Sequence, residues 1–222
     1  FYPHPQAKES IYSLPHRLRL FEEFGIAVCI VVRFDLRFSR IQAGDFIERI
    51  LVKKIKARFV YIGENFRFGA KAKGDVTLLQ KASLAYGFKL KACSVIRYRN
   101  REISSTVIRG LILSGNLKEA ERLLLRPVSV LGKVIRGSGL ATRLGFPTAN
   151  ICPSHEIAPP SGIYCVWVML KGIKLKGICY IGARPTFHRQ YARRLPSGQA
   201  GNTQYEKNIE VHIFNFRKNI YG

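Results

Sequence analysis

The chain has 222 residues, of which 47% are hydrophobic and 23% charged, an ordinary globular composition with enough residues for one large or two modest domains. Thirty-seven Lys plus Arg against fourteen Asp plus Glu give a formal net charge of +23. That excess favours anionic partners such as nucleic acid, acidic lipid or phosphate-bearing small molecules. The basic residues are interspersed and never form a run of five like charges, which excludes a dedicated basic tail.

The cysteine spacing and the lengths of the apolar stretches further narrow the class of protein. Five cysteines lie at wide, irregular spacing with no CxxC pair, which excludes a zinc ribbon and a disulfide framework and predicts a cytoplasmic protein with reduced thiols. The longest apolar stretch, residues 25–32, is far shorter than the roughly 20 residues that a membrane span needs. Residues 1–10 do not resemble a signal peptide, so we expect no membrane partner.

In chain order, the first half alternates between helix and strand. Apolar residues at helical spacing predict helices over 13–25, 43–57 and 74–88, the first closed by Gly25 and the third by Gly87. Apolar, β-branched runs predict strands over 26–34, 58–63 and 89–98, with the first two buried on both faces. Two short helices follow, over 104–115 and 116–126. This alternation predicts a parallel sheet covered by helices.

The pattern of apolar and polar residues changes near residue 126, where the second half begins. Short alternating runs separated by Gly and Pro predict strands over 129–137, 162–172, 173–182 and 208–216, with a tight turn at Lys171-Gly172. Such a pattern favours an antiparallel barrel or sandwich. We therefore predict two domains, an α/β domain over 1–126 and an all-β domain over 127–222.

Two stretches of the first half could carry chemistry. In "YIGENFRFGAKAKGD" (61–75), Gly63 permits close backbone approach and Asn65 offers a donor and an acceptor just after a predicted strand, although this stretch alone favours a plain βα loop with a basic rim. In "ISSTVIRG" (103–110), Ser104 or Ser105 can cap a helix that carries Arg109 one turn in. The free N–H groups, the helix dipole and the arginine suit a phosphate, but a capped helix needs no ligand.

The second half of the chain holds a further set of candidate site residues. Residues 132–150 place Gly137, Gly139 and Gly145 among basic residues, and a glycine-rich loop can bind phosphates with its amides. Thr148 and Asn150 carry neutral oxygens that suit a Mg²⁺ shared with substrate phosphates. In "NIEVHIF" the alternation puts Glu210 and His212 on one strand face, where Glu210 could act as a general base, although the pattern by itself favours a solvated side chain.

These stretches occur together, in order, in one known family. The motifs "FYPHP", "GENFRFG", "ISSTVIR", "RPVSVLGKV", "GFPTAN", "SGIY", "IGARPTF", "IEVHIF" and "IYG" make the chain resemble the bifunctional bacterial riboflavin kinase/FAD synthetase family over essentially its whole length. The resemblance implies a Rossmann-like nucleotidyltransferase domain followed by a riboflavin-kinase-type antiparallel β-barrel. It also implies that ATP, riboflavin, FMN and FAD are the substrates and products, with Mg²⁺ accompanying ATP.

The resemblance also assigns roles in each domain. In the kinase domain, Thr148 and Asn150 would bind Mg²⁺ and the ATP phosphates, and Glu210 would deprotonate the ribityl hydroxyl of riboflavin. Gly137 and Gly139 would lie in a loop over the nucleotide. In the adenylyltransferase domain, the nucleotide and flavin site would be formed by His4, Gly63, Asn65, Ser104, Ser105, Thr106 and Arg109.

Two departures from the family pattern matter. The family's His-x-Gly-His motif occurs nowhere in this sequence, which argues against adenylylation of FMN by this chain. The chain also starts at the "PHP" segment and stops at "IYG", so we expect it to be truncated at both ends, without the first strand–helix unit and without the closing end of the barrel.

Two further hypotheses stay open. The chain could be a catalytically inactive remnant that binds flavin or nucleotide. Its net charge of +23 also permits a nucleic-acid-binding protein, but no RRM, KH, zinc-finger or helix-turn-helix signature is readable.

Overall fold

The computed structural model describes residues 10–137, 141, 145–153, 156–183 and 207–221. The described residues divide into two compact units, one formed by 26–103 and the other by 10–25 together with 104–221. Each unit is described by itself below. The segment 10–25 therefore belongs with the second half of the chain, whereas the predicted domain boundary at residue 126 follows sequence motifs and stays a prediction.

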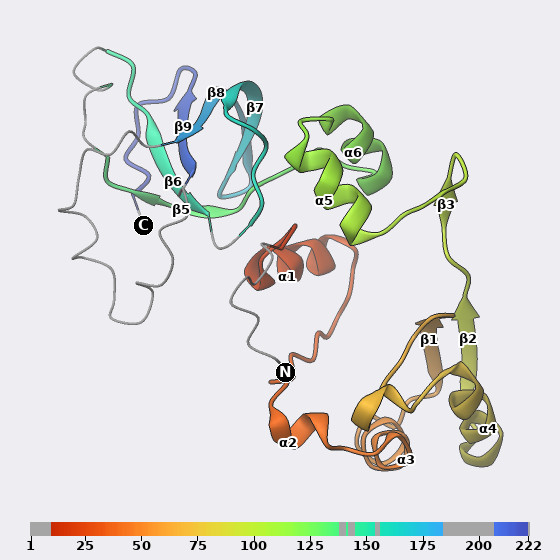
Figure 1. The fold of residues 1–222 in the computed structure, drawn as a ribbon. Helices are drawn as coiled ribbons and strands as arrows, with labels where there is room; N and C mark the ends of the chain where they lie inside the picture. The colour runs from red at the N-terminus through yellow and green to blue at the C-terminus, as the bar shows by residue number, and fades with distance from the viewer. Residues whose placement is uncertain (1–9, 138–140, 142–144, 154–155, 184–206, 222) are drawn as a thin grey trace. The chain divides into compact units, whose positions relative to one another are not determined.

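The first unit holds a short parallel sheet and the helices around it. Strand β1 (Phe59–Gly63) pairs in parallel with β2 (Lys89–Cys93), so that Gly63 lies opposite Cys93. The helix that joins them, α4 (Val76–Tyr86), is drawn in Figure 1; Asp75 caps its start, and Gly87 at φ +76° closes it, as the sequence predicts. The parallel strand–helix–strand unit expected for the first half is thus present.

The core of this unit comprises Ala43, Ile47, Phe68, Leu79, Ala82 and Phe88. The other elements of the unit are short. The remaining elements are α2 (Leu36–Ser39), α3 (Ala43–Asp45), a π-helix η1 (Phe46–Lys54), a 3₁₀ turn η2 (Ala70–Ala72) and the hairpin strands β3 (Arg97–Tyr98) and β4 (Arg101–Glu102). The helix predicted over 43–57 corresponds to α3 continued by η1, where the N–H of Ile55 donates to the carbonyl of Ile50.

Two strand predictions need correction. Residues 26–34 form no strand, and their apolar side chains are exposed, Val28 at 75% and Ile30 at 65%. A β-branched run becomes a strand only beside a partner, and β1 and β2 pair only with each other in the described sheet. Strand β1 is not buried on both faces either, because Phe59 and Tyr61 lie on an exposed face.

The second unit is built on a five-stranded antiparallel sheet in the order β5-β6-β9-β8-β7 (Figure 1). Its strands are β5 (Gly132–Ile135), β6 (Ala149–Pro153), β7 (Gly162–Leu170), β8 (Ile173–Ala183) and β9 (Lys207–Ile213). Strands β7 and β8 meet in the predicted two-residue turn, where Lys171 and Gly172 both have positive φ. One face of the sheet packs a core of Ala158, Cys179, Ile181, Ile209, Val211 and Ile213.

Three helices complete this unit, and all three match the sequence predictions. They are α1 (Leu14–Glu23), α5 (Ser105–Leu113) and α6 (Leu117–Leu124). Gly25 closes α1 two residues after Glu23, because it has a φ of +73° and its N–H donates to the carbonyl of Glu22. Helix α5 begins at Ser104, whose hydroxyl accepts the N–H of Val107 at 3.3 Å.

Candidate active site

The structure brings the second-half candidates together on one face of the sheet. Asn150 on β6 lies directly opposite Glu210 on β9, and the hydroxyl of Thr148 lies 3.5 Å from the Glu210 carboxylate. Because side chains alternate along a strand, Ile209 and Val211 turn into the core while Glu210 faces away from it. The predicted alternation is therefore correct, and Thr148, Asn150 and Glu210 form one cluster.

Asn208 joins this cluster, although the sequence analysis did not single it out. It lies two residues before Glu210 on β9, and its amide donates to Glu210 Oε1 at 2.5 Å. The signal that could have revealed it is the same period of two that paired Glu210 with His212. Thr148 thus donates to Oε2 of Glu210 and Asn208 to Oε1, so each carboxylate oxygen has one donor.

Gly137 also reaches the cluster. It follows strand β5, and a Cβ added to it would overlap the side-chain amide of Asn150. Only a glycine therefore fits this position without displacing Asn150, which is buried. Gly139, the second predicted glycine of this loop, lies outside the described residues.

The first-half candidates fall into separate groups. Gly63 ends β1 and Asn65 is exposed just beyond it, at the carboxyl edge of the parallel sheet where ligands bind in such sheets. Ser104, Ser105, Thr106 and Arg109 lie at the start of α5 in the other compact unit. His4 lies outside the described residues.

A cleft of about 270 Å³ lies beside the start of α5. Its lining joins α1, α5 and α6 and includes Tyr12, Arg17, Ser105 and Arg109. Ser104 and Thr106 do not line it. Two guanidinium groups and a helix N-terminus make this cleft suitable for an anion, and the phosphate role of Ser105 and Arg109 stays a prediction.

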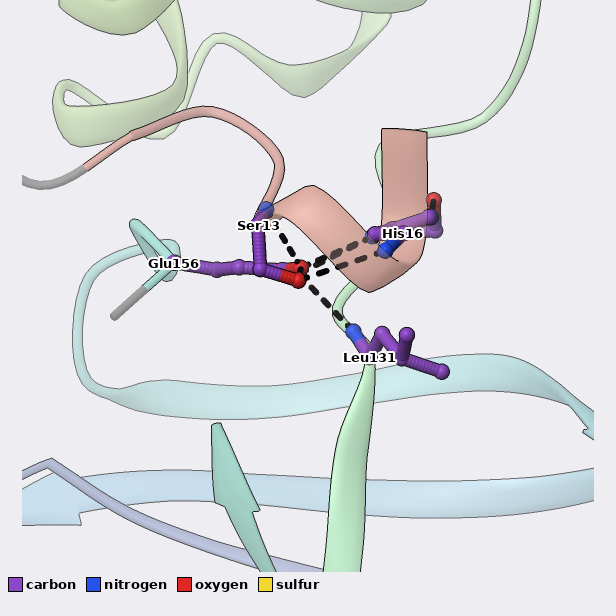
Figure 2. Close-up of polar contacts among 5 residues, drawn as sticks. Ser13, His16, Leu131 and Glu156 are labelled. Atoms are coloured by element: carbon purple, nitrogen blue, oxygen red, sulfur yellow. Dashed lines mark hydrogen bonds and ion pairs between the residues drawn. The ribbon is translucent and has the colours of Figure 1, made fainter. Parts of the chain in front are cut away.

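A buried carboxylate, Glu156, ties the N-terminal segment to the sheet (Figure 2). Its Oε1 accepts the N–H of Ser13 at 2.9 Å and the Ser13 hydroxyl at 2.6 Å, and its Oε2 accepts the N–H of Leu131 at 2.8 Å. His16 Nδ1 lies 3.0 Å from both oxygens, so this nitrogen carries the hydrogen that the carboxylate accepts. The Glu156 side chain has no exposed surface.

Two side chains in this region, Glu156 and Tyr12, have shifted pKa values. Burial alone would raise the pKa of Glu156, but hydrogen bonds from His16, Ser13 and Leu131 outweigh it and hold the pKa below its usual value. Burial raises the pKa of the Tyr12 phenol, an effect that the neighbouring Arg126 guanidinium reduces. Glu156 is therefore an ionised anchor, which the sequence analysis missed because nothing in "SHEIAPP" marks its carboxylate as buried.

Within the described residues, no group of three or more His, Cys, Asp or Glu side chains could hold a metal ion. None of the helices described here is long and apolar enough to cross a membrane.

Comparisons with known proteins find relatives for both halves of the chain. The family profile described as FAD synthetase matches residues 1–107, and the riboflavin kinase profile matches residues 124–222. A bifunctional riboflavin kinase/FMN adenylyltransferase of Buchnera aphidicola from Schizaphis graminum is 33% identical over 223 residues, covering 100% of this chain and 67% of the relative. The protein of the same name from Escherichia coli K12 is 36% identical, covering 98% of this chain and 65% of the relative.

A solved structure supports the fold assignment. It comes from Streptococcus pneumoniae, is titled a macrolide-efflux protein, and superposes with a TM-score of 0.77 at 26% sequence identity. The match covers 100% of this chain and 67% of that one. This chain thus spans about two thirds of the length of the proteins it matches.

Fold, site and comparisons define a class of protein, a transferase with an α/β nucleotidyltransferase module followed by a β kinase module. The chain belongs to the bifunctional riboflavin kinase/FMN adenylyltransferase family.

Proposed function

We propose that this chain transfers the γ-phosphoryl group of ATP to the terminal ribityl hydroxyl of riboflavin, giving FMN and ADP. The observation that carries the proposal is the convergence of Thr148, Asn150 and Glu210 on one face of the sheet. Phosphoryl transfer requires mainly that the reacting groups be positioned and their charge neutralised, and this cluster supplies a base beside neutral oxygen ligands.

Glu210 is the group that takes the proton. As the new O–P bond forms, the hydroxyl proton passes to the Glu210 carboxylate and the bond to ADP breaks. The amide of Asn208 holds one carboxylate oxygen at 2.5 Å, which fixes the orientation of the base. Glu210 therefore meets the substrate in a defined geometry rather than as a freely rotating side chain.

The residues present suit a magnesium ion that accompanies ATP. Thr148 and Asn150 offer neutral oxygens, and Glu210 adds a carboxylate beside them. Mg²⁺ binds few protein ligands, keeps several waters and shares the substrate phosphates, where it would neutralise developing charge. The close approach of Gly137 to Asn150 leaves backbone rather than a side chain facing this position.

The second family activity, adenylylation of FMN to FAD, has support from the FAD synthetase match over residues 1–107 and from the placement of Gly63 and Asn65 beyond β1. We expect FMN as the product of the kinase cluster, and any FAD formed in the same assay would be the product of this second activity. Cytoplasmic location and small-molecule partners remain part of the same proposal.

The experiment is chromatography of flavins after incubation of the chain with riboflavin, ATP and Mg²⁺. Glu210→Gln should abolish FMN formation, a loss of about 10²-fold or more for a general base. Glu121→Gln is the matched control, because Glu121 is an exposed glutamate on α6 that takes no part in the cluster. Equal rates for Glu210→Gln and Glu121→Gln would refute the role of Glu210.

The same experiment separates the alternatives. Flavin fluorescence that is quenched by the chain without any FMN formation would identify a binding remnant. Tight, strongly salt-dependent binding of RNA without flavin binding would instead favour a nucleic-acid-binding protein.

A further inference from the structure

His212 lies beside the proposed kinase site but has no role in the function above. It follows Glu210 by two residues on β9 and shares its face of the sheet. Its Nδ1 lies 2.9 Å from the backbone carbonyl of Pro147. A carbonyl can only accept, so Nδ1 carries the hydrogen, and in the neutral ring Nε2 is left as an acceptor.

The ring itself is held on two sides. Phe146 packs edge-on against His212 with ring centroids 5.9 Å apart, and Phe214 does the same at 5.8 Å, both at 73° between ring planes. Edge-to-face aromatic pairs at this distance are favourable and restrict rotation about the side-chain torsions. The imidazole is therefore fixed in both position and tautomer.

The hydrogen bond from His212 to Pro147 lies just beyond the end of the pairing between β6 and β9. The pairing of β6 with β9 begins at Ala149, opposite Val211, so Pro147 and Thr148 lie before its first rung. In that segment the Thr148 hydroxyl contacts Glu210, while the bond from His212 holds the peptide immediately before Thr148. Two side chains of β9 thus fasten the residues that precede β6.

We propose that His212 is a positioning residue for the kinase site, holding the Pro147 carbonyl so that Thr148 and Asn150 keep their places opposite Glu210. The inference rests on the proposed function, because it concerns the same phosphoryl transfer. The segment carries the oxygens proposed for the nucleotide and its metal, so the effect falls on ATP rather than on riboflavin.

Two variants separate the hydrogen bond from the ring. His212→Phe keeps an aromatic ring between Phe146 and Phe214 but removes the donor. His212→Asn removes the ring but places an amide donor near the position of Nδ1. We expect His212→Phe to lower kcat/KM for ATP about ten-fold, as loss of one well-oriented hydrogen bond would, with the KM for riboflavin unchanged. His212→Asn should recover most of the loss.

Each outcome either supports or contradicts the positioning role of His212. Normal ATP kinetics in His212→Phe, or an equal loss in both variants, would overturn the inference while leaving the kinase proposal intact. Failure of the unaltered chain to form FMN would instead count against the proposed function. A separate readout needs no turnover: long-range ¹H–¹⁵N correlation of the His212 ring should show the Nδ1–H tautomer in the neutral state. An Nε2–H tautomer would overturn the inference even in an inactive protein.

Discussion

Replacement of Glu156 tests whether one buried carboxylate holds the N-terminal segment onto the sheet. Glu156→Ala removes the acceptor that now serves Ser13, His16 and Leu131 (Figure 2). Glu156→Gln keeps one acceptor oxygen but turns an NH₂ group toward a donor. The exposed Glu121 on α6 provides the matched control, Glu121→Ala.

The expected loss of unfolding free energy follows from the donors that Glu156→Ala leaves without an acceptor. The Ser13 hydroxyl and His16 can rotate to other partners, but the backbone N–H groups of Ser13 and Leu131 are fixed by the chain. Each buried donor left without an acceptor costs about 1–3 kcal/mol, and breaking a buried ionic network costs about 3–5 kcal/mol. We expect Glu156→Ala to lower the free energy of unfolding by about 4 kcal/mol and Glu156→Gln by about half as much.

Urea unfolding provides the assay. Trp167 is the single tryptophan of the chain and lies on β7, so its fluorescence reports on the unit that contains Glu156. Glu121→Ala should change the free energy of unfolding by less than about 0.5 kcal/mol. A loss below about 1 kcal/mol for Glu156→Ala would refute the reasoning, because water or neighbouring groups would then satisfy the same donors.

The same carboxylate predicts a pH dependence. The pKa of Glu156 is lower in the folded protein than its usual value of 4.5, so the folded state binds this proton less readily than the unfolded state. Its stabilising contribution is therefore complete above about pH 4.5 and is lost as the pH falls through the folded-state pKa. The stability difference between the unaltered chain and Glu156→Gln should be constant near neutral pH and shrink in acid; a difference that grew in acid would contradict this sign.

Three further predictions concern the sheet. Gly172→Ala should lower the free energy of unfolding by about 1 kcal/mol through backbone strain, since φ is +82° and no atom crowds the new methyl group. Gly177→Ala should cost more, because its Cβ would lie 2.5 Å from the His212 carbonyl oxygen; urea unfolding that ranks the two variants in the opposite order would contradict this. Burial raises the pKa of Cys179 to about 11, so a thiol reagent at pH 8 should label the four exposed cysteines quickly and Cys179 only after unfolding, and rapid labelling of five would contradict its burial.

Local sequence signals predicted most of the elements correctly. The cap at Ser104, one of two candidate caps, the helix-ending glycines and the Lys171-Gly172 turn depend on neighbouring residues, and the structure contains all of them. The expected strand over 26–34 failed because a strand depends on a partner elsewhere in the chain, which a local pattern cannot supply.

The same distinction applies to the candidate site. The alternation in 208–216 correctly placed Glu210 opposite the core residues, and the family motifs selected Thr148 and Asn150. Their mutual contact depends on the antiparallel register of β6 and β9, which are separated by more than fifty residues of sequence. The Glu156 network was missed for the same reason, because it joins residues 143 positions apart.

The position of β9 in the sheet constrains when the protein can become active during synthesis. This strand follows β6, β7 and β8 in sequence yet lies between β6 and β8, so neither half of the sheet connects to the other until residues 207–213 are available. Before that point on the ribosome, the β7–β8 hairpin can form from adjacent residues, whereas β6 lacks its inner neighbour. Because Glu210 is carried by β9, the proposed catalytic base arrives in the same step that joins β6 to β8, and a nascent chain lacking β9 has neither.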